Sequence, residues 1–228
     1  MTTLLIAAHP DDEVLGCGGT ALKLAQAGQA VHVAILGEGI TSRHAHRSDA
    51  DAGQLSQLHA CSQQAGTLIG ASSVRNLSLP DNRFDTVPLL DVVKLIEALI
   101  DELQPETVFT QHGGDLNIDH VVTYRATLTA TRPLLGCPVR TVYAYEVPSS
   151  TEWAFGSFEP RFQPQVFVDI EDTLEQKIQA MESYESEARV FPHPRSPEAL
   201  RSIAQRWGSQ AGMAAAEVFS VVRELKSW

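Results

Sequence analysis

Short apolar runs recur along the first two thirds of the chain, each bounded by polar or turn-forming residues. The first, TLLIAA at residues 3–8, shows no alternation of apolar and polar positions. Apolar runs of this kind are typical of strands buried on both faces of a parallel sheet. We therefore expect five strands here, at residues 3–8, 30–37, 73–79, 107–111 and 140–147.

The segments between these strands carry apolar residues at helical spacing, at 14–27, 51–66, 87–105 and 120–134. The first helix ends before Gly28, because glycine readily adopts the left-handed backbone that closes a helix. The helix at 87–105 ends at Pro105, which cannot continue it. Strands that alternate with helices predict an α/β sandwich with a mostly parallel sheet.

The last third of the chain has a different pattern. PQVFVDI at residues 164–170 indicates an edge strand, and VFPHPRSPE at 190–198 indicates a proline-rich loop. Helices are expected on either side of that loop, at 173–188 and 199–212. No repeat, low-complexity tract or linker divides the sequence, so we expect a single domain over residues 1–228.

Composition narrows the class of protein. Of 228 residues, 43% are hydrophobic and 20% charged, as in globular domains. The formal net charge of −11 disfavours a general nucleic-acid partner, which needs a basic face. Neither a signal sequence nor an apolar run of the ~20 residues needed for a membrane span is expected. Three widely separated cysteines favour reduced thiols in a cytoplasmic protein.

A histidine and three acids, HPDDE at residues 9–13, follow the first expected strand. Ligands of open α/β sheets bind outside the carboxyl ends of the strands, where this segment falls. Ionising adjacent carboxylates costs free energy that a cation offsets. Alternatively, these residues form a turn and a helix N-terminus, where acids are favoured.

A second cluster, QHGGDLNIDH at residues 111–120, follows the fourth expected strand. Two such clusters at strand ends favour a metal site over two helix caps. A catalytic zinc ion takes about three protein ligands and keeps one position open. We therefore expect His9, Asp12 and His120 to be the ligands. Asp11 is then the candidate general base.

The motifs AHPDDE and DLNIDH together resemble those of the LmbE-like (PIG-L) family of zinc-dependent N-deacetylases. The resemblance implies a Rossmann-like, three-layer α/β sandwich. It also implies that His9, Asp12 and His120 bind the metal and that Asp11 is the general base. Asp119 would then orient His120 as a carboxylate partner.

The second motif departs from the family pattern. Many members have a histidine that assists at the oxyanion where this chain has Asn117. An asparagine donates a hydrogen bond but supplies no proton. Asn117 and His193 are therefore the candidates for polarising the substrate carbonyl, with His112 as a further substitute.

Two other segments are candidates for substrate binding. Arg83 and Asp85 in DNRFD resemble the family's sugar-contacting pair, although Asp-Asn-Arg is also a common surface turn. A small basic cluster suits either a loop that covers the site or a solvated loop, and the solvated loop is favoured. Its members are Arg43, His44, His46 and Arg47.

The expected activity is removal of an acetyl group from an N-acetylated amino sugar or sugar conjugate by metal-activated water. One alternative is a broader amidase acting on a thiol-sugar or acylated antibiotic-type conjugate. Another is a metal- or sugar-binding module without catalysis. The expected cofactor is Zn²⁺, although two histidines and one aspartate also suit Fe²⁺. The expected partner is this small molecule, with no nucleic acid or membrane insertion, and a homo-oligomer stays open.

Overall fold

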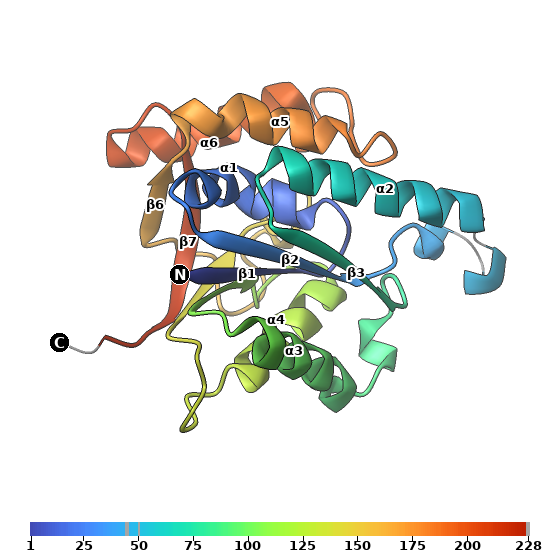
Figure 1. Ribbon diagram of the computed structural model, residues 1–228. Helices are drawn as coiled ribbons and strands as arrows, with labels where there is room; N and C mark the ends of the chain where they lie inside the picture. Colours follow the sequence, from blue (N-terminus) through green and yellow to red (C-terminus); the bar gives the residue numbers. More distant parts are fainter. Residues whose placement is uncertain (44–45, 50, 227–228) are drawn as a thin grey trace.

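The computed structural model of the chain describes residues 1–43, 46–49 and 51–226. A seven-stranded sheet forms the middle layer, in the order β3-β2-β1-β4-β5-β7-β6, and helices cover both faces (Figure 1). This is the expected α/β sandwich with a mostly parallel sheet. The strands are β1 (Thr2–Ala7), β2 (Ala30–Gly37), β3 (Ser73–Leu79), β4 (Thr107–Gln111), β5 (Thr141–Tyr145), β6 (Val166–Asp169) and β7 (Ala216–Glu224).

The strands β1 to β5 pair in parallel, and all five were expected from the apolar runs. The chain runs from β1 outward through β2 to β3, then returns to place β4 on the other side of β1. The strand order therefore reverses between β1 and β4. Loops leave such a point in opposite directions and open a crevice at the carboxyl ends of the strands.

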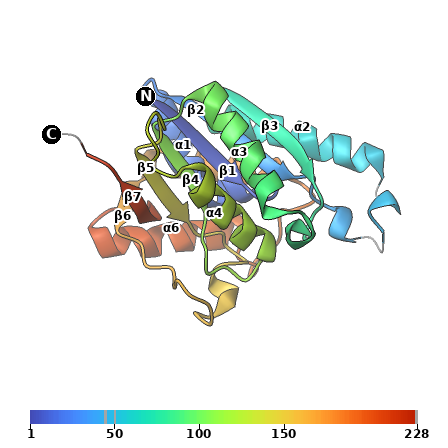
Figure 2. The same ribbon diagram turned by 90° about the horizontal axis from the view of Figure 1, so that it is seen from below.

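Helices pack against the two faces and enclose two large hydrophobic cores and a smaller one around Trp207. Helices α1 (Asp12–Gln26), α2 (Ala52–Leu68), α5 (Leu174–Glu182) and α6 (Pro197–Ala211) cover one face, and α3 (Leu89–Leu103) and α4 (Ile118–Ala130) cover the other (Figures 1 and 2). Within the described part of the chain, no helix is both long and apolar enough to cross a bilayer. Cys17, Cys61 and Cys137 form no disulfide with one another in the structure.

Close approach of α1 to the sheet depends on its glycines. A Cβ atom on Gly16 would lie 2.1 Å from Cδ2 of Tyr145, and one on Gly19 would lie 2.9 Å from Cγ2 of Ile170. Neither distance leaves room for a side chain. The start of α1, which carries the acid cluster, is therefore held directly against the sheet.

The carboxyl-terminal third contains an element that the pattern did not predict. β7 lies antiparallel between β5 and the edge strand β6. Its Glu217 is buried inside the strand and paired with Lys177 at 2.7 Å, so the segment lacks a clean apolar run. The helix expected at 173–188 ends earlier, at Glu182, and the expected loop at 37–53 contains two short 3₁₀ turns.

Candidate metal centre and catalytic site

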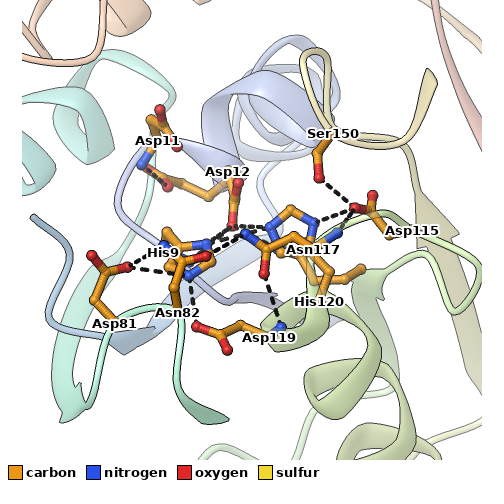
Figure 3. A network of polar contacts seen from close by, with 12 residues as sticks. His9, Asp11, Asp12, Asp81, Asn82, Asp115, Asn117, Asp119, His120 and Ser150 are labelled. Atoms are coloured by element: carbon orange, nitrogen blue, oxygen red, sulfur yellow. Dashed lines mark hydrogen bonds and ion pairs between the residues drawn. The ribbon is translucent and has the colours of Figure 1, made fainter. Parts of the chain in front are cut away.

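The two sequence clusters meet at the carboxyl ends of β1 and β4 (Figure 3). His9 follows β1, and Asp12 opens α1. His120 lies in the first turn of α4, whose N-cap is Asn117. The reversal of strand order thus brings together side chains that lie more than a hundred residues apart in the sequence.

Three ligand atoms face one another at this point. His9 Nδ1 lies 3.4 Å from Asp12 Oδ2, and His120 Nε2 lies 3.3 Å from both of these atoms. A tetrahedral zinc site with bonds of about 2.0–2.1 Å has edges of about 3.3–3.4 Å between its ligand atoms. The three atoms are therefore spaced as one face of such a tetrahedron. This spacing fits a zinc-sized ion.

Each histidine has a carboxylate behind its other ring nitrogen. His9 Nε2 lies 3.0 Å from Asp119 Oδ2, and His120 Nδ1 lies 3.2 Å from Asp115 Oδ1. The second contact is an ion pair without hydrogen-bond geometry. Carboxylates in these positions fix ring orientation and leave the opposite nitrogen free to bind a metal. The expectation that Asp119 orients His120 is therefore wrong, because Asp119 points at His9 and Asp115 takes the predicted role.

Neighbouring side chains fix the carboxylates in turn. Asp119 Oδ1 accepts the Phe84 amide hydrogen at 2.9 Å. Asp115 accepts hydrogen bonds from the Ser150 hydroxyl and, at 2.6 Å, from Thr151 Oγ1. Gln111, the last residue of β4, donates from Nε2 to Asp12 Oδ2 at 2.6 Å. Few of these groups are free to reorient, so the site is organised in advance.

The electrostatics of the centre show what the side chains do without a cation. Burial opposes charge on His120, but Asp12 and Asp115 outweigh it and raise its pKa to about 9. Burial likewise opposes charge on His9, whose pKa is nevertheless raised well above its usual value by Asp119, Asp12 and Asp81. The two histidines lower the pKa of Asp12 well below normal, against burial. In the metal-free chain, protons on the histidines balance the carboxylates, and a divalent cation suits the same place.

Asp11 is constrained at both its backbone and its side chain. Its φ of 103° lies in the left-handed region, which a non-glycine residue rarely occupies. The Glu13 carboxylate accepts the Asp11 amide hydrogen at 3.1 Å, and Tyr184 holds Glu13 from the other side. The Asp11 carboxylate pairs with Arg195 at 2.7 Å. Burial raises the pKa of Asp11 well above its usual value, against the Arg195 charge.

A polar cavity of about 200 Å³ opens beside the centre and is lined by His9, Asp11 and residues of several loops. Asn117 lies on its wall, where its Nδ2 donates to Asn82 Oδ1 at 3.0 Å. The other end of the Asn117 side chain caps α4 by accepting the Asp119 amide hydrogen at 2.9 Å. Asp81 lines the same cavity and lies 3.5 Å from His9 Nε2.

Several candidates from the sequence lie away from this cavity. Arg83 and Asp85 are exposed and do not belong to its described lining. His193 accepts the Arg195 amide hydrogen at 3.1 Å and packs against Trp153. His112 bonds to the Pro160 carbonyl at 2.7 Å. Neither histidine lines the cavity, so their substitution for the missing family histidine has no support in this geometry.

The basic loop has more structure than expected. Arg43 pairs with Glu187 and lines the cavity, and Arg47 pairs with Glu38 at 2.6 Å. Both side chains are nevertheless about half exposed, 46% for Arg43 and 53% for Arg47, so the loop is solvated as expected, while Arg43 also reaches the cavity. His46 is exposed, and His44 lies outside the described residues.

The sequence reasoning missed several residues of the site. Gln111 ends β4 and Asp81 closely follows β3, so the strand-end rule that found His9 also applies to them. Ser150 and Thr151 belong to SSTEW at residues 149–153, a segment that the sequence singles out, together with Arg195, as candidate pocket lining. Glu187 was not expected, and its place depends on a loop of the carboxyl-terminal half.

Fold and site together define an α/β protein with a candidate mononuclear metal centre at the switch point of its sheet. The family model described as PIG-L, GlcNAc-PI de-N-acetylase, matches residues 4–131, more than half of the chain. The chain belongs to this family, which confirms the resemblance of its two motifs.

Two curated relatives cover most of the chain. It is 29% identical over 189 residues to an uncharacterized deacetylase, YaiS, of Escherichia coli, covering 80% of this chain and 90% of the relative. It is 27% identical over 244 residues to 1D-myo-inositol 2-acetamido-2-deoxy-alpha-D-glucopyranoside deacetylase of a Mycobacterium strain, JLS. That match covers 88% of this chain and 79% of the relative.

Solved structures share the fold. N,N'-diacetylchitobiose deacetylase from Pyrococcus horikoshii has a TM-score of 0.77 at 21% identity, over 97% of this chain and 84% of its own. The 4-carboxy-2-hydroxymuconate hydratase GalB from Pseudomonas putida has the same TM-score and identity, over 100% of this chain and 98% of its own. The fold therefore carries more than one reaction, and function has to be argued from the site.

Proposed function

We propose that the protein is a metal-dependent N-deacetylase that acts on an N-acetylated amino sugar or sugar conjugate. The observation that carries the proposal is the triangle formed by His9, Asp12 and His120, with the Asp11 carboxylate beside it in a polar cavity. Family membership and two relatives named as deacetylases support the reaction class. The inositol-linked acetamido sugar in one of those names supports the substrate class.

The proposed metal ligands are His9 Nδ1, Asp12 Oδ2 and His120 Nε2. A zinc or iron(II) ion held there would supply Lewis-acid chemistry, lowering the pKa of a water molecule and polarising the amide carbonyl. Asp119 and Asp115 would keep the two imidazoles oriented, each at the ring nitrogen that does not bind the metal.

The chain's own residues supply the proton transfers. Asp11 takes a proton from the attacking water as the carbon–oxygen bond forms. The same carboxyl group returns it to the nitrogen as the carbon–nitrogen bond breaks, releasing acetate and the free amine. Asn117 is the proposed donor toward the substrate carbonyl, since its amide group lies on the cavity wall. Asp81, Asn82 and Ser42 offer the cavity further polar groups suited to sugar hydroxyls.

Metal content and amine release, measured together, test this proposal. The wild type should hold about one metal ion per chain and release amine from N-acetylglucosamine derivatives. Asp11→Asn should keep the metal and lose at least about 10²-fold in kcat, because it removes the general base. His120→Ala should lose both. The matched control is Asp101→Asn, an exposed acid on α3, which should change neither.

Three outcomes contradict the proposal in different ways. A wild type that binds metal but releases no amine from any N-acyl compound favours the module without catalysis. Release from N-acyl compounds that lack a sugar favours a broader amidase. If the wild type binds no metal and His120→Ala does not change its activity, the acid cluster is better interpreted as a helix N-cap.

A further inference from the structure

Arg195 contacts the carboxylate of Asp11, and it comes from a part of the chain that the family match does not reach. The match ends at residue 131, whereas Arg195 lies in the proline-rich loop before α6. Its NH1 group donates to Asp11 Oδ2 at 2.7 Å. Both groups line the polar cavity.

The guanidinium is itself fixed by two further contacts. Its Nε donates to Ser149 Oγ at 2.8 Å, and NH1 also reaches Glu187 Oε2 at 3.3 Å. Only 22% of the side chain is exposed. An arginine held at several nitrogens presents its charge in one direction, which a lysine ammonium cannot reproduce.

The loop that carries Arg195 is also anchored. The Arg195 amide hydrogen bonds to His193 Nδ1 at 3.1 Å, and the next residue, Ser196, caps α6 by accepting the Ala199 amide hydrogen at 3.1 Å. Ser196 is fully buried, so the cap fixes the loop at the start of the helix. The position of Arg195 therefore follows from the packing of α6.

Without Arg195, the Asp11 carboxylate has no other side-chain donor within the described residues. Its backbone is held at an unusual φ by Glu13, but this bond leaves the side-chain torsions free. Asp11 would then sample several rotamers, of which a subset faces the cavity.

We propose that Arg195 is the positioning residue of Asp11, so that the carboxyl-terminal third completes the catalytic site. This inference rests on the proposed function, in which Asp11 is the general base. Arg195 touches neither the proposed metal nor its ligands. It affects the reaction only by fixing the orientation of the Asp11 carboxylate.

The test compares wild type, Arg195→Ala, Arg195→Lys, Asp11→Asn and the Asp11→Asn/Arg195→Ala double variant. Arg195→Ala should lower kcat by about 10- to 100-fold, the loss expected when a catalytic group is misplaced by an ångström. KM and metal content should change little. Guanidinium ion, added far below denaturing concentrations, should restore part of the lost kcat by refilling the site. Arg195→Lys should restore less than half of it.

The double variant and a matched control separate positioning from a structural role. If Arg195 acts through Asp11, its removal should cost no further rate in the Asp11→Asn background. Arg201→Ala breaks an exposed pair between Arg201 on α6 and Glu175 on α5 and should leave kcat unchanged. Thermal unfolding of the cycle should show that the changes of Tm caused by the two single substitutions are not additive.

Contrary results distinguish failure of the positioning role from failure of the proposed function. A raised KM with unchanged kcat assigns Arg195 to substrate binding and overturns the inference. So do an unchanged kcat, additive losses of rate, or a loss of kcat without guanidinium rescue. An inactive wild type overturns the proposed function, and the role in catalysis falls with it. An active wild type with an equally active Arg195→Ala overturns the positioning role alone.

Discussion

At the scale of single residues, Asp11 combines a strained backbone with a buried charge. A non-glycine residue at φ 103° costs free energy that the surrounding structure has to offset. Glu13 accepts a hydrogen bond from the Asp11 amide, and Arg195 donates one to the Asp11 carboxylate. Strain of this kind persists where geometry matters more than stability, which is consistent with a catalytic role for Asp11.

Glu146, away from the candidate metal centre, is another carboxyl group whose pKa depends on burial and on a hydrogen bond. Burial raises its pKa to about 7, against the hydrogen bond from Trp207 Nε1 at 2.5 Å. Because the folded-state pKa lies above the usual 4.5, the wild type loses stability as pH rises from about 4.5 through 7. Glu146→Gln should therefore gain stability relative to wild type at pH 8, by at most about 3 kcal/mol. At pH 4.5 the gain should vanish.

Thermal unfolding between pH 4.5 and pH 8 measures this difference. The exposed Glu182 on α5 serves as control, and Glu182→Gln should show no such trend. A constant difference in Tm between Glu146→Gln and wild type across this range would show that the Glu146 carboxyl is as acidic in the folded chain as in the unfolded one.

Some residues of the candidate site could be predicted from their position after a strand, and others could not. His9 and Asp12 follow β1 directly, and His120 follows β4 by one loop, so the strand-end rule finds all three. Arg195 has no such relation to a strand of the site. Its contact with Asp11 joins residues 184 positions apart and depends on where α6 packs.

At the scale of elements, a buried ion pair joins α1, α5 and β7. Lys177 Nζ donates to Glu217 Oε1 at 2.7 Å and to the Leu15 carbonyl at 2.8 Å. Glu217 also accepts the amide hydrogens of Gly19 and Thr20 from α1. Nearly all polar groups of the pair are thereby satisfied, which a buried charge requires.

Breaking this pair should be costly. Lys177→Met leaves the Glu217 charge buried without its partner, so the free energy of unfolding should fall by about 3–5 kcal/mol. Urea denaturation measures it, with Arg201→Met as the control. That variant breaks an exposed pair and should cost about 0–1 kcal/mol. Equal losses in the two variants would mean that the Lys177–Glu217 pair is solvated.

Helices and strands were predictable from the sequence where their apolar residues form a continuous run or recur at helical spacing. The strands β1 and β2 are apolar runs that can be read directly, whereas β3 also contains Arg75 and Asn76. Helix α3 has a regular apolar stripe, and Val92, Ile96, Leu99 and Ile100 of that stripe lie in the core. β7 was missed because its buried positions include Glu217, whose partner lies on another element. A pattern within one segment contains no information about a charge neutralised from outside it.

At the scale of the whole molecule, the candidate metal site joins the two ends of the region matched by the family model. His9 and Asp12 come from the first strand and helix, and His120 comes from the helix after β4. An ion bound only in the folded state stabilises the chain by about 4 kcal/mol at a thousandfold excess over its Kd. Metal should therefore raise Tm.

The size of this shift should depend on pH. Because the pKa of His120 is about 9 in the metal-free chain, metal binding has to displace a proton below that pH. The apparent affinity should weaken about tenfold for each unit of pH below 9 from this group alone. The gain in Tm on adding zinc should therefore be larger at pH 8 than at pH 6, and absent in His120→Ala. A shift independent of pH, or retained in that variant, would place the ion elsewhere.

The insertion of β7 between β5 and β6 has a consequence for synthesis. β6 pairs with β7, so it has no neighbour in the sheet until the chain has been made through residues 216–224. Until Glu217 has been synthesised, Lys177 and the backbone amides of Gly19 and Thr20 also lack this hydrogen-bond partner. The five parallel strands, β1 to β5, lie within residues 2–145 and are therefore synthesised before β6 and β7. The seven-stranded sheet is complete only after β7 has left the ribosome. A ribosome stalled just before residue 216 would hold a chain whose candidate metal ligands have been synthesised but whose sheet lacks β7.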